Sequence, residues 1–227
     1  FNLFKFPFEA ILIDPGGDHQ LIIDQIEEKN LKPIAILNTH AHLDHIGAVS
    51  KLKKTYDIPF YLHKEERVIL DSYESSCEMF GLPIKEKPTV DKWLDNEMKL
   101  SLGDFSVIII NTPGHTPGGV CYEIENHIFV GDTLFLGSVG RTDLPGGNWD
   151  TLQQSLIHLI NIVDHDKTIH SGHGNDTKLN HWDSYFESRD FGWNGIINNL
   201  DLKEFIDIEF DALISYYKKD NLELNYA

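Results

Sequence analysis

The segment THAHLDH, Thr39 to His45, places three histidines and one aspartate within seven residues. It follows the apolar run Ile34–Leu37, which is typical of a β-strand, so the segment is expected to be the loop after that strand. In an extended loop, residues i and i+2 point to the same side, and His40 and His42 should therefore converge on one point. Asp44 could follow them, whereas His45 should point elsewhere, at the expected start of a helix.

This pattern is typical of a metal site. Imidazole and carboxylate groups together suit zinc, and they also suit iron or manganese. Because His45 diverges from the two earlier histidines, one short loop could supply ligands to two adjacent ions. The alternative is a polar surface loop with coincidental histidines. Isolated histidines mean little in a chain with 12 of them, but H-x-H-x-D-H arises by chance in about one such chain in a thousand.

Further candidate ligands stand in turn-rich segments later in the chain. They are His115 in TPGHTPGG (112–119), Asp132 in FVGDTLF (129–135) and His173 in HSGHGND (170–176). A carboxylate such as Asp132 can bridge two ions through its two oxygens. A single loop histidine is more often only a solvated polar residue, and the spacing alone assigns none of the three to a particular ion.

The other histidines are expected to bind no metal. His170 lies close to His173, but strand alternation turns it away, so its role should be structural. Six have no ligand partner in the sequence and are expected at the surface: His19, His63, His127, His158, His165 and His181.

The surrounding sequence alternates between strand and helix patterns. Strands are expected at 10–13, 34–37 and 59–63, with helices at 18–30, 46–56 and 64–73, which predicts α/β layering. Several short apolar runs within 99–135, separated by Gly, Pro and Asn, predict antiparallel strands. The last expected elements are a helix at 149–163, a short strand within 167–174 and an amphipathic helix at 202–217.

The motifs H-x-H-x-D-H, G-H-T-P-G, G-D-T-L-F and G-H-G, in this order, resemble those of the metallo-β-lactamase-fold hydrolases over residues 9–180. SVGRTDLPGGNWDTLQQSL (138–156) and GHGNDT (172–177) most resemble the short glyoxalase II-like enzymes, which are hydroxyacylglutathione hydrolases, and their persulfide dioxygenase relatives. Ser171 replaces the usual proline. The resemblance implies an α/β fold, a four-layer αββα sandwich. It also implies a catalytic domain at 1–180 and a mainly helical extension at 181–227 packed on it.

The resemblance also implies roles for the candidate ligands. It places His40, His42 and His115 on a first metal. It places Asp44, His45 and His173 on a second, with Asp132 as the bridge. Up to two zinc ions per chain are expected, with iron or manganese possible, and Asp44 is expected to be catalytic by orienting the attacking group and handling its proton.

The implied activity is metal-dependent hydrolysis of a small-molecule thioester, such as a hydroxyacyl-glutathione, by a metal-bound hydroxide. Three alternatives stay open. The first is an iron-dependent persulfide dioxygenase using His40, His115 and Asp132. The others are a lactonase or β-lactamase, and a non-catalytic binding module, which the complete ligand set disfavours. Arg141 and Asp143 either contact substrate or form an ion pair that holds their loop.

The composition of the chain limits the classes of binding partner and the cellular location that we expect. The formal net charge of −17 disfavours nucleic acids and anionic membranes. No apolar run approaches the roughly 18 residues of a membrane span, and the segment after Phe1 does not resemble a signal peptide. Two cysteines without metal or redox spacing favour a cytoplasmic protein. After Leu179 the sequence departs from the family's pattern, and the tail offers few cations for glutathione. The thiol carrier and oligomeric state therefore stay open.

Overall fold

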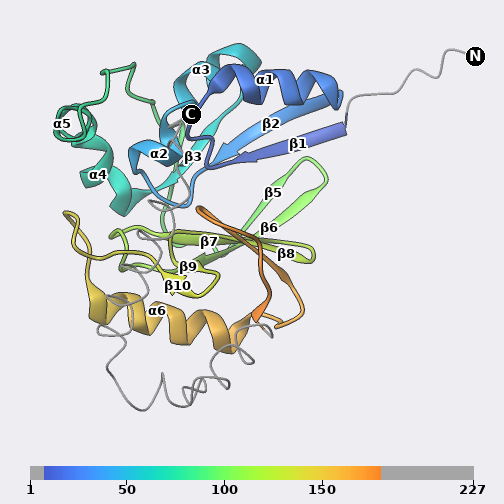
Figure 1. Ribbon diagram of the computed structural model, residues 1–227. Coiled ribbons are helices and arrows are strands. Elements are labelled where there is room, and N and C mark those ends of the chain that lie inside the picture. Colours follow the sequence, from blue (N-terminus) through green and yellow to red (C-terminus); the bar gives the residue numbers. More distant parts are fainter. Residues whose placement is uncertain (1–7, 180–227) are drawn as a thin grey trace, which may run out of the picture.

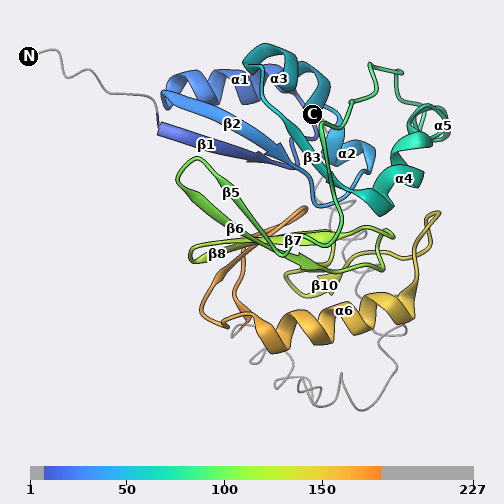
Figure 2. The same ribbon diagram turned by 180° about the vertical axis from the view of Figure 1, so that it is seen from behind.

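A computed structural model describes residues 8–179 of the 227-residue chain. Two β-sheets face each other, and helices cover the outer face of each, so the layers follow the order α, β, β, α (Figure 1, Figure 2). This confirms the expected four-layer sandwich. Among the described residues, no helix is long and apolar enough to cross a membrane. The predicted helix at 202–217 and the extension at 181–227 lie outside the described residues.

The first sheet is parallel throughout. Its strands lie in the order β1 (Phe8–Ile13), β2 (Leu31–Leu37), β3 (Phe60–His63) and β4 (Lys92–Leu94). Parallel neighbours need long crossover connections, and helices supply them. These are α1 (His19–Glu28), α2 (Leu43–Ile46), α3 (Val49–Tyr56), the 3₁₀ helix η1 (Lys64–Glu66), α4 (Arg67–Asp71) and α5 (Tyr73–Met79).

The helix expected at 46–56 is divided into α2 and α3. The division falls at Gly47, where a side chain has no room because an added Cβ would lie 2.1 Å from the Gly16 carbonyl oxygen. The backbone N–H of Ala48 donates to the carbonyl oxygen of Pro15 at 3.0 Å. The loop after β1 therefore interrupts the helix. The helix expected at 64–73 is likewise divided, into η1, α4 and the start of α5.

The second sheet confirms the antiparallel run expected at 99–135. Its antiparallel strands are β5 (Lys99–Leu102), β6 (Phe105–Asn111), β7 (Val120–Ile124) and β8 (His127–Gly131). β11 (Thr168–Ser171) pairs in parallel with β8, and α6 (Trp149–Ile162) covers the outer face. A small ribbon of β9 (Leu134–Phe135) and β10 (Ser138–Val139) leads toward α6. The short strand β4 was not predicted.

Three apolar clusters fill the spaces between the layers. Ile36, Leu52 and Phe60 belong to the cluster under the first helices, Ile128 and Leu152 to the one under α6. The cluster between the sheets contains Leu37, Val107, Ile109 and Tyr122. This packed interior supports the loops that follow β2, β6, β8 and β11, which carry the candidate ligands.

Candidate metal centre

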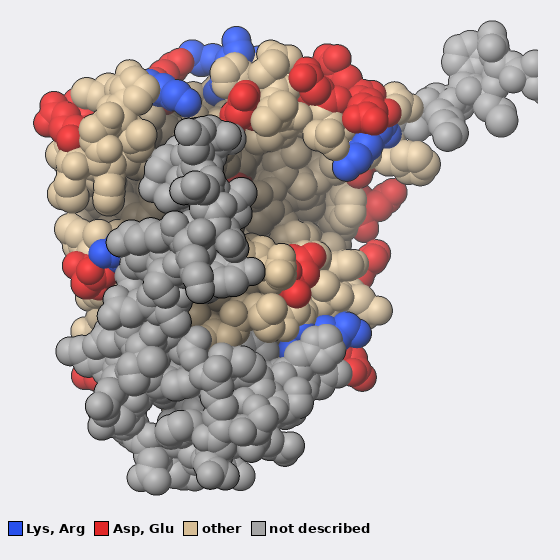
Figure 3. Space-filling view, in the orientation of Figure 1, with Lys and Arg blue, Asp and Glu red and all other residues tan. Residues whose placement is uncertain are grey.

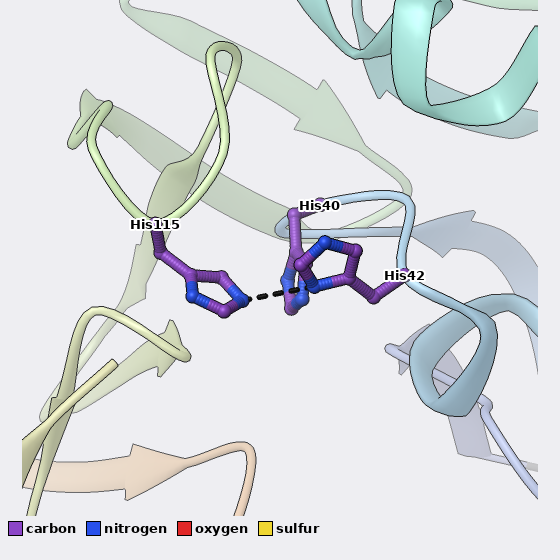
Figure 4. Close-up of side chains that lie close together, drawn as sticks. All are labelled: His40, His42 and His115. Atoms are coloured by element: carbon purple, nitrogen blue, oxygen red, sulfur yellow. Dashed lines mark hydrogen bonds between the residues drawn. The ribbon is translucent and has the colours of Figure 1, made fainter. Parts of the chain in front are cut away.

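Three histidines converge from loops of both sheets (Figure 4). His40 and His42 follow β2, and His115 lies in the loop between β6 and β7. Nε2 of His115 lies 2.9 Å from Nδ1 of His42. The ring centroid of His40 lies 4.8 Å from that of His42 and 4.9 Å from that of His115. The i, i+2 argument for His40 and His42 therefore matches their observed convergence.

The outer contacts of two rings determine which nitrogens carry lone pairs. The carbonyl oxygen of Arg141 can only accept, so Nδ1 of His115 donates to it at 2.6 Å and Nε2 keeps its lone pair. The hydroxyl of Thr39 donates to Asp14 at 2.6 Å, so it accepts from Nδ1 of His40 at 3.0 Å. Nε2 of His40 is thereby left with a lone pair. It is buried and has no hydrogen-bond partner.

Burial also keeps these histidines neutral. It is the main cause that lowers the pKa of His42 to about 4, and it lowers the pKa of His40 and His115 below the ordinary value. Neutral imidazole is the form that binds metals. An unpaired buried nitrogen costs about 1–3 kcal/mol, and a cation held by the three rings would remove that cost. The donor set therefore fits a transition-metal ion.

A second group lies beside the three histidines. It consists of Asp44, His45, Asp132 and His173, whose ligand atoms lie within 4.8 Å of one another. Nε2 of His173 lies 3.0 Å from Oδ2 of Asp44 and 3.5 Å from Oδ2 of Asp132. Nε2 of His45 lies 3.3 Å from Oδ1 of Asp132. Oδ2 of Asp132 is also 3.6 Å from Nε2 of His115, so Asp132 stands between the two groups.

Opposite charges compensate one another in this second group. Hydrogen bonds with Asp132 and Asp44 raise the pKa of His173 to about 10. Burial alone would raise the pKa of Asp132, but its hydrogen bonds with His173 and His45 hold that pKa well below its usual range. A cation among these residues would take the place of the protons on the histidines.

Exposure differs between the two groups. His40 and His115 are buried, with 2% and 5% of their surface exposed. The side chains of Asp44 and His173 are 49% and 56% exposed. A substrate from solvent therefore meets Asp44 and His173 first, since the other two members of the second group, His45 and Asp132, are buried.

The sequence did not predict the side chains that contact these ligands from outside the ligand set and orient them. Asp14 follows β1 and accepts from the backbone N–H of Thr39 at 2.7 Å, and its Oδ2 lies 3.2 Å from Nδ1 of His45. Asn38 donates to the carbonyl oxygen of His45 at 2.7 Å. Such outer contacts orient metal-binding histidines. The one local signal was Asp14 at the end of an apolar strand.

Arg141 and Asp143 form a bidentate ion pair. Nε and one terminal nitrogen of the guanidinium each donate to a carboxylate oxygen at 2.6 Å. Both side chains are exposed. The ion-pair interpretation is therefore confirmed, and a substrate contact stays a prediction.

The prediction that His63 lies at the surface is wrong. Only 8% of it is exposed, because it ends β3 beneath the loop of His115. Its Nε2 lies 3.2 Å from the carbonyl oxygen of Asp95. His170, expected to be structural, stacks on Phe129 and lies 2.9 Å from Oδ2 of Asp176. The prediction for His181 lies outside the described residues.

Comparison with known proteins places the chain among metal-dependent enzymes. The profile of the metallo-beta-lactamase superfamily matches residues 9–173, and that of a family of unknown function, DUF6913, matches residues 150–227. The chain is 40% identical to the probable metallo-hydrolase YqgX of Bacillus subtilis (strain 168), over 75% of this chain and 82% of that one. It is 36% identical to the hydroxyacylglutathione hydrolase GloC of Haemophilus influenzae, over the same two shares.

Two solved structures are similar in both sequence and fold. The B3 metallo-beta-lactamase BLEG-1 is 41% identical with a TM-score of 0.71, and the match covers 76% of this chain and 84% of that one. TTHA1623 in a di-iron-bound form is 37% identical with a TM-score of 0.66, and the match covers 74% and 83%.

Proposed function

The chain belongs to the metallo-β-lactamase superfamily of metallo-hydrolases, and we propose that it hydrolyses a thioester such as a hydroxyacyl-glutathione. The observation that carries the proposal is the pair of adjacent ligand groups: three histidines, and beside them two aspartates and two histidines, of which Asp44 and His173 are exposed. The similarity to GloC, a hydroxyacylglutathione hydrolase, supports a thioester as the substrate.

The two groups are proposed to hold one metal ion each. His40, His42 and His115 would hold the first, while Asp44, His45 and His173 would hold the second, with Asp132 shared. Nε2 of His40, which is buried and has no hydrogen-bond partner, supports the first assignment. Nε2 of His45 and Oδ1 of Asp132 are also buried and lie 3.3 Å apart within the second group, which supports the second. We propose zinc, and the similar di-iron-bound structure makes iron the first alternative to test. Bound there, such ions supply Lewis acidity, which polarises a carbonyl and acidifies water.

The two carboxylates have different environments and are proposed to have different roles. Asp132 is buried between the two groups and is compensated by His45 and His173, which suits a fixed ligand. Asp44 is half exposed. Burial opposes its ionisation, but the hydrogen bond with His173 and the nearby charges of His45 and His173 together outweigh burial and lower the pKa of Asp44. An ionised carboxylate at the solvent edge can orient an attacking water and accept its proton.

The proposal is tested by metal analysis together with a substrate panel. We expect up to two transition-metal ions per chain and measurable hydrolysis of S-lactoylglutathione or a similar thioester, with little turnover of penicillins. A chain that takes up neither zinc nor iron would contradict the metal assignment. Lactones or β-lactams turned over faster than every thioester tried would contradict the substrate class.

Hydrolysis of β-lactams is the second candidate. The 41% identity to BLEG-1, a B3 metallo-beta-lactamase, favours it. Both reactions attack a carbonyl carbon, so the ligand groups alone do not separate them. The relative kcat/KM on a thioester and on a penicillin decides between them.

A persulfide dioxygenase is a further alternative. A single-iron dioxygenase needs only two histidines and one carboxylate, whereas seven ligands in two groups favour two ions. One tightly bound iron with oxygen consumption would reverse that preference.

We further propose a small-molecule substrate, no nucleic-acid or membrane partner, and a cytoplasmic location. On the face in Figure 3, the described Lys and Arg side chains lie in small groups beside Asp and Glu. Cys77 and Cys121 are both free and buried, which suits a reducing compartment. Binding to DNA or to anionic vesicles at physiological salt would contradict the proposal.

A further inference from the structure

One fully buried carboxylate is not explained by the proposed ligand set. Glu66, the last residue of η1, has 0% of its surface exposed. Glutamate is almost never fully buried unless it is paired. Burial is also the main cause that raises the pKa of Glu66, so its charged form requires strong hydrogen bonds.

Glu66 finds these partners in two ligand loops. Oε2 accepts from the backbone N–H of Ala41 at 2.8 Å, and Oε1 accepts from the backbone N–H of Gly118 at 2.7 Å. Ala41 lies between His40 and His42, and Gly118 lies three residues after His115. One carboxylate thereby connects the loop after β2, in the first sheet, with the loop between β6 and β7, in the second.

Gly118 packs directly against the backbone of Glu66 and the side chain of His63, with no room for a larger residue. A Cβ added to Gly118 would lie 2.7 Å from the backbone nitrogen of Glu66 and 2.9 Å from Nδ1 of His63. Both distances are shorter than real Cβ contacts, so a larger residue would push the loop of His115 away from η1. The buried His63 forms part of the surface against which this loop packs.

We propose that Glu66 is a positioning residue for the three-histidine group: it fixes the separation between the loop of His40 and His42 and the loop of His115. This inference rests on the proposed metal-binding role of those histidines. Metal ligands must be held within about 0.5 Å of their working geometry by supporting contacts, and the two hydrogen bonds supply such contacts. Only the first group draws ligands from both of these loops, because the second takes none from the loop between β6 and β7, so the effect should be selective for the first site.

The test measures zinc affinity at each site separately. Glu66→Gln keeps the size of the side chain but turns one acceptor into an NH₂ group, which cannot accept from a backbone N–H. Two double variants are made. One combines Glu66→Gln with His173→Ala, which leaves the first site complete, and the other combines it with His40→Ala, which leaves the histidines of the second site intact. Zinc Kd is then measured by competition with a chromogenic chelator. Glu65→Gln, the same change at the exposed neighbouring position, is the matched control.

In the His173→Ala background, Glu66→Gln should weaken zinc binding by roughly 10- to 100-fold, as expected for a lost outer contact. In the His40→Ala background it should leave Kd within about twofold, and Glu65→Gln should change neither. An unchanged first-site Kd, even with a lower melting temperature, would overturn the proposal, and so would equal weakening of both sites. If Glu66→Gln does not fold, Glu66→Asp, whose shorter side chain reaches one loop only, is judged by the same criteria. A parent protein without zinc or iron uptake would instead contradict the proposed function.

Discussion

At the scale of single residues, exposure separates two carboxylates of the same chemical type. The side chain of Asp132 is 10% exposed and lies within 3.6 Å of three histidines. The side chain of Asp44 is 49% exposed and lies at the open edge. Asp44 is therefore the carboxylate that a solvent-borne substrate can reach.

Asp44→Asn should lower kcat on the best thioester by about 10²–10⁴-fold, the usual contribution of a general base. The amide keeps the size of the side chain but accepts a proton poorly. The fold and the first-site metal should remain, because Asp44 is an exposed member of the second group. Kcat and metal content are measured on the same preparation. A near-native kcat would remove Asp44 from the mechanism, and loss of all metal would show that the two sites are not separable.

Arg141→Ala and Asp143→Ala should have small and similar effects. Their exposed ion pair is worth about 0–1 kcal/mol, and the hydrogen bond between His115 and residue 141 uses a backbone oxygen, which survives both changes. The melting temperature and KM are measured for each variant. A rise in KM in Arg141→Ala alone would instead assign a substrate contact to the guanidinium.

At the scale of elements, α6 supports the loop that carries His115. Leu152 of α6 is fully buried, and a Cβ added to Gly114 would lie 2.3 Å from its backbone nitrogen. Gly114 has φ of 137°, which favours glycine. The helix and the loop therefore pack backbone against backbone, with no side chain between them.

Leu152→Ala should destabilise the protein by about 2–5 kcal/mol, the range for a leucine truncated in a packed core. Ile157→Ala on the same helix is the control, since Ile157 is 36% exposed and should cost much less. Urea unfolding curves give both values. Similar losses for the two variants would show that the Leu152 side chain is not part of the packed core under α6.

Asp91, which directly precedes β4, links α3 to β3 and makes part of the stability depend on pH. Burial raises its pKa, but hydrogen bonds from Lys53 of α3 and from the backbone N–H of Phe60 in β3 outweigh burial and lower it below 3.8. Its stabilisation is therefore present above pH 3.8 and is lost as pH falls through the lower folded-state pKa.

Wild type should accordingly be more stable than Asp91→Asn at pH 6, by at most about 1 kcal/mol because the ion pair is partly exposed. The difference should shrink toward pH 2–3. Melting temperatures of both proteins across this range provide the check. A difference that stays constant with pH would assign the effect of the variant to something other than charge.

At the scale of the whole molecule, each ligand group draws residues from both sheets. The first joins the loop after β2 to the loop after β6, and the second joins the loop after β2 to those after β8 and β11. Bound ions would therefore connect the two halves of the sandwich, and a ligand that binds only the folded state stabilises it.

Removing the metal with a chelator should lower the melting temperature. An ion at a free concentration 100 times its Kd contributes about 2.7 kcal/mol. The control is the double variant His40→Ala, His173→Ala, which should melt at the same temperature with and without chelator. Scanning calorimetry before and after chelation, followed by re-addition of zinc, measures the effect. An unchanged wild-type melting temperature would contradict the bridging role.

The sequence by itself determined what depends on neighbours along the chain. The i, i+2 spacing placed His40 and His42 on one side, and strand and helix periods identified most elements. The start of α1 is also local, because Oδ1 of Asp18 accepts from the N–H of Gln20 at 2.8 Å. Only the tertiary structure decided which distant groups meet. His115 reaches His42 across 73 positions, and Glu66 joins two loops from different sheets. Burial of His63 and the break at Gly47 have the same origin, because contacts between segments far apart in sequence leave no local periodic pattern.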